Sequence, residues 1–356
     1  MVRIGVVGFG EWGPNHVRNF SSISGVKVAG VADGRAERLQ AAQQQFEGLQ
    51  VFPTHHELFD RAELDAVAIA TPTSTHAAII RDALDRGLHV LCEKPICSNV
   101  ADAEDIVARA DRAGRVVMVG HVFLFNSGIR KLRQILVDKE LGDIRYLTAR
   151  RTNLGPIRDD VNAAWDLASH DISIVNFLLD SHPVQVSAVG HGYLDRPLQD
   201  VAFFTLTYPN GVLANVHASW LDPVKVREIT AVGTAKMVVW NDLGSMGPIQ
   251  IFDKGVVRGR RYADFGDFQL LARQGDVTIP HVPMEEPLRA QARAFVAALT
   301  SGSAGISDAR CGLAVVKVLD AIDRSMARGG APVDVGDVGD VVAPVDAASA
   351  MNVTRA

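Results

Sequence analysis

The feature that most constrains the fold is a glycine-rich turn between an apolar strand and a helix. Residues 2–7 have the apolar pattern of a short strand, and Gly8, Gly10 and Gly13 follow in the order G-x-G-x-x-G. A helical stretch from Pro14 to Phe20 comes next, with proline suited to its first turn. Glycines in this setting permit a tight turn, the approach of a pyrophosphate and close packing of helix on strand. The pattern predicts a dinucleotide site, with a plain glycine turn as the alternative.

The first 122 residues continue as an alternation of predicted strands and helices. Further strands are expected at 26–32, 66–70, 89–92 and 116–120, and helices at 36–46, 75–86 and 100–113. Such alternation is typical of a parallel sheet covered by helices on both faces. We therefore predict an α/β fold class whose N-terminal domain, residues 1–122, is a doubly wound parallel sheet of the Rossmann type that binds NAD(P).

Asp33 ends the second predicted strand, twenty residues after Gly13. An acidic side chain at this place accepts hydrogen bonds from the ribose 2′-hydroxyl of NAD, which favours NAD over NADP. Arg35 and Arg38 follow closely, and their guanidinium groups offer an alternative, which is contact with the 2′-phosphate of NADP. Asp33 also suits a capping role for the helix that starts near Arg35, and the two roles are compatible.

The strand at 89–92 runs into the motif Glu-Lys-Pro at residues 93–95. Because ligands bind outside the carboxyl ends of the strands in open α/β sheets, Lys94 is expected to face the cofactor crevice. Residues 71–76 follow a neighbouring strand and are expected at the same edge, although His76 suits a cap equally well. The residues expected to contact the cofactor are Gly8, Phe9, Gly10, Glu11, Trp12, Gly13, Asp33, Arg38, Thr71, Pro72, His76, Glu93 and Lys94.

Strands dominate the second half of the chain after a helix at 127–139. They are expected at 142–151, 184–190, 201–208, 212–220, 226–232 and 236–240, and an Asn-Gly turn joins two of them. Short turns impose antiparallel pairing on neighbouring strands. We predict an α+β domain over residues 123–330 with an open-faced, mainly antiparallel sheet. A face left open in this way suits substrate binding and self-association as a homodimer or homotetramer.

Two amphipathic helices are expected near the end of the chain, at 288–300 and 311–328. They are expected to pack on the second sheet or back on the first domain. Residues 331–356 are rich in small residues and are predicted to form a weakly ordered tail, in which 333–335 can add an edge strand.

Asp166 and His170 lie four residues apart at the start of a predicted helix that runs to Leu179. On a helix, this spacing puts both side chains on one face, where a carboxylate raises the basicity of the imidazole and orients it. Taken alone, such a pair is more often a solvated helix pair. Asp171 is interpreted as a helix-face carboxylate, and Trp165 as core filling or as a wall of the substrate site.

Three further polar residues precede this helix, namely Arg151, Asn153 and Arg158. One or more of them are predicted to bind substrate hydroxyls or phosphates, since guanidinium groups bind such oxygens well. Each of them taken singly is equally compatible with a surface loop.

Together these motifs resemble the Gfo/Idh/MocA family of oxidoreductases. The glycine turn, residues 70–72 with His76, the motif at 93–95 and the segment 164–174 carry a resemblance that covers about residues 1–330. It implies a Rossmann domain followed by an open-faced sheet, with catalysis by Lys94, Asp166 and His170. With the residues predicted above from their own chemistry, the residues expected to bind substrate are Lys94, Arg151, Asn153, Trp165, Asp166 and His170.

The later segment most resembles the branch that acts on C3 of nucleotide-linked sugars such as UDP-N-acetylglucosamine and its uronic acid. We expect an NAD(P)-dependent oxidoreductase, in which His170 takes the proton of the reacting hydroxyl and Lys94 stabilises its oxygen, or with these two roles exchanged. An inositol or free-sugar dehydrogenase with the same residues is the alternative among enzymes. A dinucleotide-binding regulator without catalysis is the alternative from another class.

Composition limits the remaining function classes. With 22% charged residues and a net charge of -5, the chain has no basic footprint for nucleic acid. No apolar run approaches the roughly 20 residues of a membrane helix, and no signal-peptide pattern follows Met1, so a cytoplasmic protein without membrane partners is expected. Three cysteines without a C-x-x-C pair argue against disulfides and a zinc site, and no metal is expected.

Overall fold

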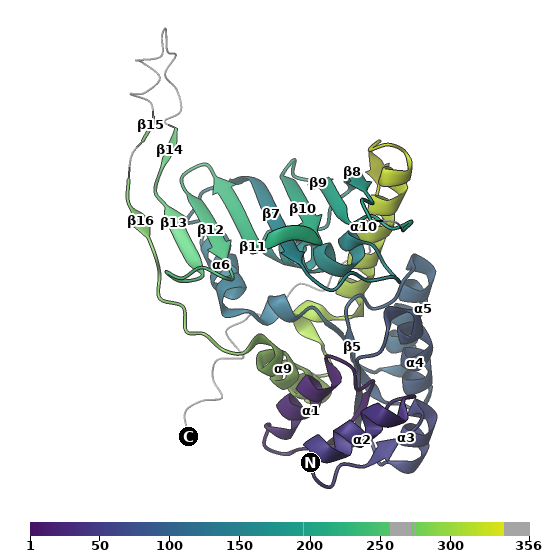
Figure 1. Ribbon diagram of the computed structural model, residues 1–356. Helices are drawn as coiled ribbons and strands as arrows, with labels where there is room; N and C mark the ends of the chain where they lie inside the picture. Colours follow the sequence, from purple (N-terminus) through teal and green to yellow (C-terminus); the bar gives the residue numbers. More distant parts are fainter. Residues whose placement is uncertain (195, 257–271, 274, 338–356) are drawn as a thin grey trace. The chain divides into compact units, whose positions relative to one another are not determined.

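The structure, a computed structural model, describes residues 1–194, 196–256, 272–273 and 275–337 (Figure 1). The described chain forms two compact units. The first contains Met1–Phe125 and Glu286–Lys317, and the second contains Asn126–Glu285 and Val318–Gly336. Among the described residues, no helix combines the length and the apolar character needed to cross a membrane.

A six-stranded parallel sheet forms the centre of the first unit, in the order β3-β2-β1-β4-β5-β6. Its strands are β1 Val2–Val7, β2 Val26–Ala32, β3 Val51–Phe52, β4 Ala66–Ile69, β5 His89–Glu93 and β6 Val117–Gly120. The helices that follow them are α1 Gly13–Ser21, α2 Ala36–Gln45, α3 His55–Arg61, α4 Thr73–Asp85, α5 Val100–Ala113 and the 3₁₀ helix η1 Val122–Phe125. Strand β4 is buried along its whole length, as expected where helices cover both faces of a sheet.

This topology confirms the predicted Rossmann sheet. The strand order reverses between β1 and β4, and doubly wound sheets bind nucleotides at that point. The turn after β1 carries the glycines, and the turn after β4 carries Thr71 and Pro72.

Two elements of the first unit lie outside the predicted alternation. Strand β3 has two residues and helix α3 has seven, so neither is long enough to show a hydrophobic period. The start of α3 does carry a local signal, because Thr54 Oγ1 accepts a hydrogen bond from the Glu57 amide at 3.2 Å. This Ser/Thr-x-x-Glu spacing is typical of a helix N-terminus.

Helix α9, Pro287–Ser301, belongs to the first unit although it follows the second sheet in the chain. It packs on α1, where Phe295 meets Phe20 edge-on with ring centroids 6.1 Å apart. Arg18 of α1 also pairs with Glu286, which caps the start of α9, at 2.5 Å. The sequence left two packing sites open for this helix, the second sheet and the first domain. The helix packs on the first domain. The 3₁₀ helix η3, Gly305–Ser307, follows, and α10, Ala309–Ala327, begins in the first unit and ends in the second.

The second unit contains a nine-stranded mixed sheet in the order β16-β13-β12-β11-β7-β10-β9-β8-β17. Its strands are β7 Ile144–Leu154, β8 Gln185–His191, β9 Val201–Thr207, β10 Leu213–Ser219, β11 Leu221–Gly233, β12 Met237–Asn241, β13 Ile249–Phe252, β16 Val277–Thr278 and β17 Val333–Asp334. They run side by side in Figure 1, and β14 Gly255–Val256 pairs separately with β15 Ala272–Arg273. Strand β7 pairs parallel with β10 and the other ladders are antiparallel, which confirms a mainly antiparallel sheet.

Helices α6 Ser127–Val137, α7 Ser169–Leu179 and the π-helix η2 Ala164–Ala168 contact this sheet. Strand β9 shows the resulting two-sided pattern, because Ala202, Phe204 and Leu206 are buried whereas Phe203 between them is 46% exposed. Side chains of directly paired residues lie on the same face. Phe203 pairs with the exposed Val189 on β8 and with His217 on β10. Leu213 lies four residues before His217, on the same face of β10, and pairs with Tyr146 on β7; both are exposed.

The predicted tail begins inside the described part of the chain. Val333 pairs with Val186, so β17 adds the edge strand that the sequence allows at 333–335. The rest of the predicted tail, residues 338–356, lies outside the described residues.

Candidate active site

The turn after β1 accepts only glycine at two positions. Gly8 has φ of +93°, and a Cβ there would lie 2.5 Å from the Ala70 carbonyl oxygen. A Cβ on Gly13 would lie 2.3 Å from the Gly8 carbonyl oxygen. Only glycine therefore allows α1 to begin so close to the end of β1. At Gly10 the nearest atom is Nη1 of the flexible Arg38 side chain, at 2.9 Å from such a Cβ. The backbone is thus kept bare where a pyrophosphate would meet the N-terminus of α1, and these residues fit a bound NAD.

Asp33 is held against this turn with its side chain 7% exposed. Its Oδ2 accepts a hydrogen bond from the Phe9 amide at 2.8 Å, and its Oδ1 accepts one from the Arg35 amide at 2.9 Å. The second bond forms an Asx turn before α2 and is not a helix cap, because Arg35 is the N-cap residue and, among the described residues, the helix start has no side-chain cap hydrogen bond. Arg38 Nη1 lies 3.5 Å from Oδ2, so the carboxylate and a guanidinium both reach the place expected for the adenosine ribose.

His76 connects the two loops that follow β4 and β5. Its Nε2 lies 2.9 Å from the Thr71 carbonyl oxygen and its Nδ1 lies 2.9 Å from the Pro95 carbonyl oxygen. The imidazole is buried at the start of α4. His76 therefore positions the loop of Lys94 relative to the loop after β4, which is a larger role than a helix cap.

Lys94 follows the last residue of β5, at the carboxyl edge of the parallel sheet, and its peptide bond to Pro95 is cis. The neighbouring Glu93 is held by a residue of α1, the buried His16. The Oε1 atom of Glu93 lies 2.8 Å from Nε2 of His16. The sequence gives no signal for this partner, since His16 stands on a helical face among apolar residues. The contact anchors the strand end that carries Lys94.

His121 is a second residue that the sequence analysis does not identify. It follows β6 as Lys94 follows β5, so its position at the carboxyl edge is the signal that could have found it. Complete burial, with the positive charge of Lys94 as a smaller cause, lowers the pKa of His121 to about 3. Among the described residues neither ring nitrogen has a hydrogen-bond partner. A neutral imidazole has one donor and one acceptor, and in this structure both are buried at the carboxyl edge of the sheet.

Asp166 lies in the second unit, in the middle of the π-helix η2. Its Oδ2 accepts a hydrogen bond from Trp220 Nε1 at 3.1 Å, and its Oδ1 lies 3.5 Å from Arg158 Nη1. Single turns of π-helix are frequent at functional sites. The structure thus brings together Asp166 and Arg158, two of the predicted site residues.

His170 is half-buried in the first turn of α7, directly after the π-helix. The expected regular helix over 166–179 is therefore a π-helical turn followed by an α-helix. A bond between the Asp166 carboxylate and the His170 imidazole stays a prediction.

Trp165 and Arg151 are engaged inside the second unit. Trp165 is buried, and its Nε1 donates to Oδ2 of Asp323 on α10 at 2.6 Å, which favours core filling over a substrate wall. Arg151 forms two parallel hydrogen bonds with the Asp171 carboxylate, at 2.8 and 2.9 Å, and both side chains are at most 3% exposed. Asp171 is therefore buried rather than on an open helix face. Substrate contacts of Arg151 and of the half-buried Asn153 stay predictions.

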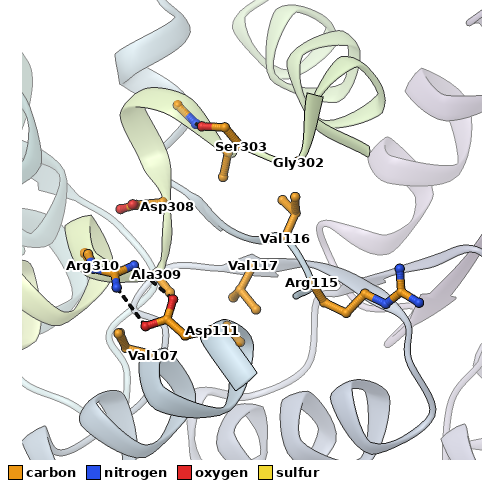
Figure 2. A pocket seen from close by; sticks show the side chains of 13 residues that line it. Val107, Asp111, Arg115, Val116, Val117, Gly302, Ser303, Asp308, Ala309 and Arg310 are labelled. Atoms are coloured by element: carbon orange, nitrogen blue, oxygen red, sulfur yellow. Dashed lines mark hydrogen bonds and ion pairs between the residues drawn. The ribbon is translucent and has the colours of Figure 1, made fainter. Parts of the chain in front are cut away.

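A cavity of about 200 Å³ lies elsewhere in the first unit (Figure 2). It is lined by the end of α5, by the residues before β6 and by residues 302–310, and Arg310 pairs with Asp111 across it at 2.7 Å. This cavity is at the amino end of β6, whereas Lys94 and the glycine turn are at the carboxyl edge. We assign it no part in the candidate active site.

Comparison with known proteins agrees with this geometry. Residues 2–121 match a family described as an oxidoreductase family with an NAD-binding Rossmann fold, and residues 129–239 match the GFO/IDH/MocA C-terminal domain. UDP-N-acetylglucosamine 3-dehydrogenase from Acidithiobacillus ferrooxidans is 35% identical over 221 residues, which are 61% of this chain and 67% of that protein. Inositol 2-dehydrogenase 2 from Paenarthrobacter aurescens is 31% identical over 226 residues, which are 60% and 68% of the two chains.

A solved structure of the Acidithiobacillus ferrooxidans enzyme has the same fold. The TM-score is 0.77 at 26% identity, and the match covers 92% of this chain and 98% of that chain. The similarity therefore extends beyond the Rossmann sheet to the second sheet.

Proposed function

Because the chain belongs to the Gfo/Idh/MocA family of NAD-binding oxidoreductases, we propose that it transfers hydride between NAD and C3 of a nucleotide-linked sugar. The observation that carries the choice of substrate is the 35% identity to a UDP-N-acetylglucosamine 3-dehydrogenase. The glycine turn after β1 and Asp33 after β2 support the use of NAD, because they provide a bare backbone and a fixed carboxylate where a dinucleotide binds.

The cofactor-binding residues are proposed from the first unit. Gly8, Gly10 and Gly13 would hold the pyrophosphate at the start of α1, and Asp33 would bind the adenosine ribose. NAD, when bound, supplies the nicotinamide that exchanges hydride with the reacting carbon.

The proton of the reacting hydroxyl is handled by the chain's own groups. We assign its removal to His170, whose imidazole would be oriented by Asp166, and the stabilisation of the oxygen to the Lys94 ammonium. In the opposite direction His170 would return the proton to the keto oxygen. Support for these roles comes from the family motifs and from the anchoring of Glu93 and Pro95 by His16 and His76.

A substrate panel tests the proposal. NADH formation is measured with UDP-N-acetylglucosamine, its uronic acid, N-acetylglucosamine, glucose and myo-inositol. We expect kcat/KM for a nucleotide-linked sugar to exceed that for free sugars by on the order of 10²-fold or more, because contacts to the diphosphate are converted into transition-state binding. Preference for myo-inositol would instead establish the alternative suggested by the inositol dehydrogenase relative. Tight NAD binding without turnover of any sugar would favour a regulator.

We also propose that two copies associate through the open face of the second sheet. Four large apolar side chains are exposed there, namely Tyr146, Val189, Phe203 and Leu213. An exposed apolar patch of this kind is typical of an interface, and a single patch pairs with its own copy around a two-fold axis.

The substitution Phe203→Lys is expected to convert a dimer or tetramer into smaller species, because it puts a charge into the proposed interface. Mass measured by light scattering after gel filtration checks this. Val137→Lys, at a 57% exposed position on α6, is the matched control and should leave the mass unchanged. A monomeric unmodified chain, or an unchanged mass of the Phe203 variant, would refute this interface.

A further inference from the structure

Three side chains that are typical metal ligands converge on the surface of the first unit, and none of them belongs to the glycine turn. His55 and His56 open α3, and Asp82 lies near the end of α4. His55 Nε2 lies 2.9 Å from Asp82 Oδ2, and His56 Nδ1 lies 3.7 Å from the same oxygen. All three potential ligand atoms lie within 4.8 Å of one another.

The convergence of two adjacent histidines is unusual for a helix. Neighbouring helical residues do not face each other, yet these two imidazoles lie with ring centroids 4.0 Å apart and both approach one carboxylate. The arrangement is possible because Thr54 starts the helix at His55, so both residues lie in its first turn. Phe59 then packs edge-on against the His55 ring at 5.5 Å and limits its rotation.

We propose that His55, His56 and Asp82 bind a divalent metal ion of the Zn²⁺ type and so join α3 to α4. Zinc binds imidazole nitrogens and carboxylate oxygens at about 2.0–2.1 Å in a tetrahedron, which separates ligand atoms by about 3.3 Å. The two observed distances, 2.9 and 3.7 Å, lie on either side of this value. The third separation, between the two imidazole nitrogens, is at most 4.8 Å, so the site forms if side-chain rotations bring these nitrogens to about 3.3 Å from each other.

The ligand set also selects the class of metal. Two imidazoles favour zinc, copper or nickel, whereas Mg²⁺ and Ca²⁺ prefer sites made only of oxygen. His56 is 55% exposed and Asp82 is 34% exposed, so solvent can supply the fourth ligand and the ion can exchange. In the absence of metal the same residues form an ordinary hydrogen bond between His55 and Asp82, which is the competing interpretation.

The expected role of this ion is stabilisation of the Rossmann unit, which goes beyond the proposed oxidoreductase activity. Helix α3 leads into β4 and helix α4 leads out of it, so the ion would link the two crossovers around a central strand. A ligand that binds only the folded state raises stability by mass action. None of the three residues belongs to the candidate active site, and turnover below the melting range should not require the metal.

Calorimetry and thermal unfolding of the full chain test the site. The protein is first treated with EDTA and exchanged into chelator-free buffer, and ZnCl₂ is then titrated against it. We expect one Zn²⁺ per chain and a rise in Tm of roughly 2–4 °C or more when the site is nearly saturated, whereas MgCl₂ at the same concentration produces no rise. Absence of Zn²⁺ binding with one-to-one stoichiometry would overturn the proposal.

Two variants, one in α3 and one in α4, test whether Zn²⁺ binds at this cluster. His56→Gln and Asp82→Asn should each weaken Zn²⁺ binding at least tenfold and remove the rise in Tm, because each replaces a good zinc ligand by a weakly coordinating neutral amide. His281→Gln is the matched control, since this exposed histidine lies outside the cluster, and it should bind Zn²⁺ as the unmodified chain does. Circular dichroism without metal establishes that each variant is folded. Unchanged binding by both folded variants would refute the site, and hydride transfer, measured separately, reports on the proposed function alone.

Discussion

Replacement of Lys94 by alanine is expected to lower turnover by on the order of 10²-fold or more while NAD binding stays close to that of the unmodified chain. The ammonium is proposed to stabilise negative charge on the reacting oxygen, and a group positioned before the reaction contributes mostly in the transition state. Its loop is fixed independently of the side chain, because His76 binds the Pro95 carbonyl and His16 binds Glu93. The loss should therefore appear in kcat rather than in the affinity for NAD.

Steady-state kinetics with the best sugar of the substrate panel, together with NAD titration by fluorescence, measure the two quantities. Lys27→Ala is the matched control, since Lys27 is an exposed lysine on β2 of the same unit. It should leave both quantities unchanged. Near-normal turnover by Lys94→Ala would exclude the proposed mechanism, and a large loss of NAD affinity would instead assign Lys94 to the cofactor site.

The sequence predicts the first unit well because its signals are local. Each buried strand is a short apolar run, and the turn that contains Gly8 and Gly13 tolerates no other residue there. The strand order of the second sheet depends instead on pairing between segments that are distant in the sequence. Strand β7 lies between β10 and β11, and its partners are distant in the chain. Tyr146 pairs with Leu213 and Leu154 pairs with Leu221, each 67 residues further along. Turns identify hairpins, but only side-chain packing across the sheet selects the strand that a hairpin joins.

The residues of the candidate site also divide into those that local patterns predict and those that only the tertiary fold brings together. Motif spacing identifies Lys94, Asp33, Asp166 and His170, because each belongs to a short pattern with a chemical reason. The partners that fix them come from distant segments, and one example is Trp220, whose indole binds Asp166 from 54 residues away. Arg151 is a second example, because the sequence does not predict its ion pair with Asp171 on helix α7. Partners of this kind depend on the tertiary fold.

The buried pair of Arg151 and Asp171 is expected to produce the largest loss of stability on single substitution. Arg151→Met leaves the Asp171 carboxylate without its guanidinium partner in a nearly inaccessible position. An uncompensated buried charge costs about 3–5 kcal/mol, and Asp171→Leu should cost a similar amount because it strands the guanidinium. Urea denaturation followed by circular dichroism measures the free energy of unfolding. A loss below about 1 kcal/mol in both variants would contradict a buried pair, because that is the range of exposed ion pairs.

The double variant Arg151→Met with Asp171→Leu separates this structural role from substrate binding. Both charges are removed together, so no unpaired charge stays buried, and apolar replacement of a buried ion pair often costs little stability. Leucine is larger than aspartate, so a smaller packing cost is expected to remain. If Arg151 acts only through Asp171, the double variant regains stability and its KM for the sugar stays near that of the unmodified chain. If Arg151 also binds substrate, as the chemistry of its guanidinium group predicts, stability returns while KM rises. Steady-state kinetics on the refolded double variant therefore decides between an internal support of the sheet and a direct ligand of the sugar.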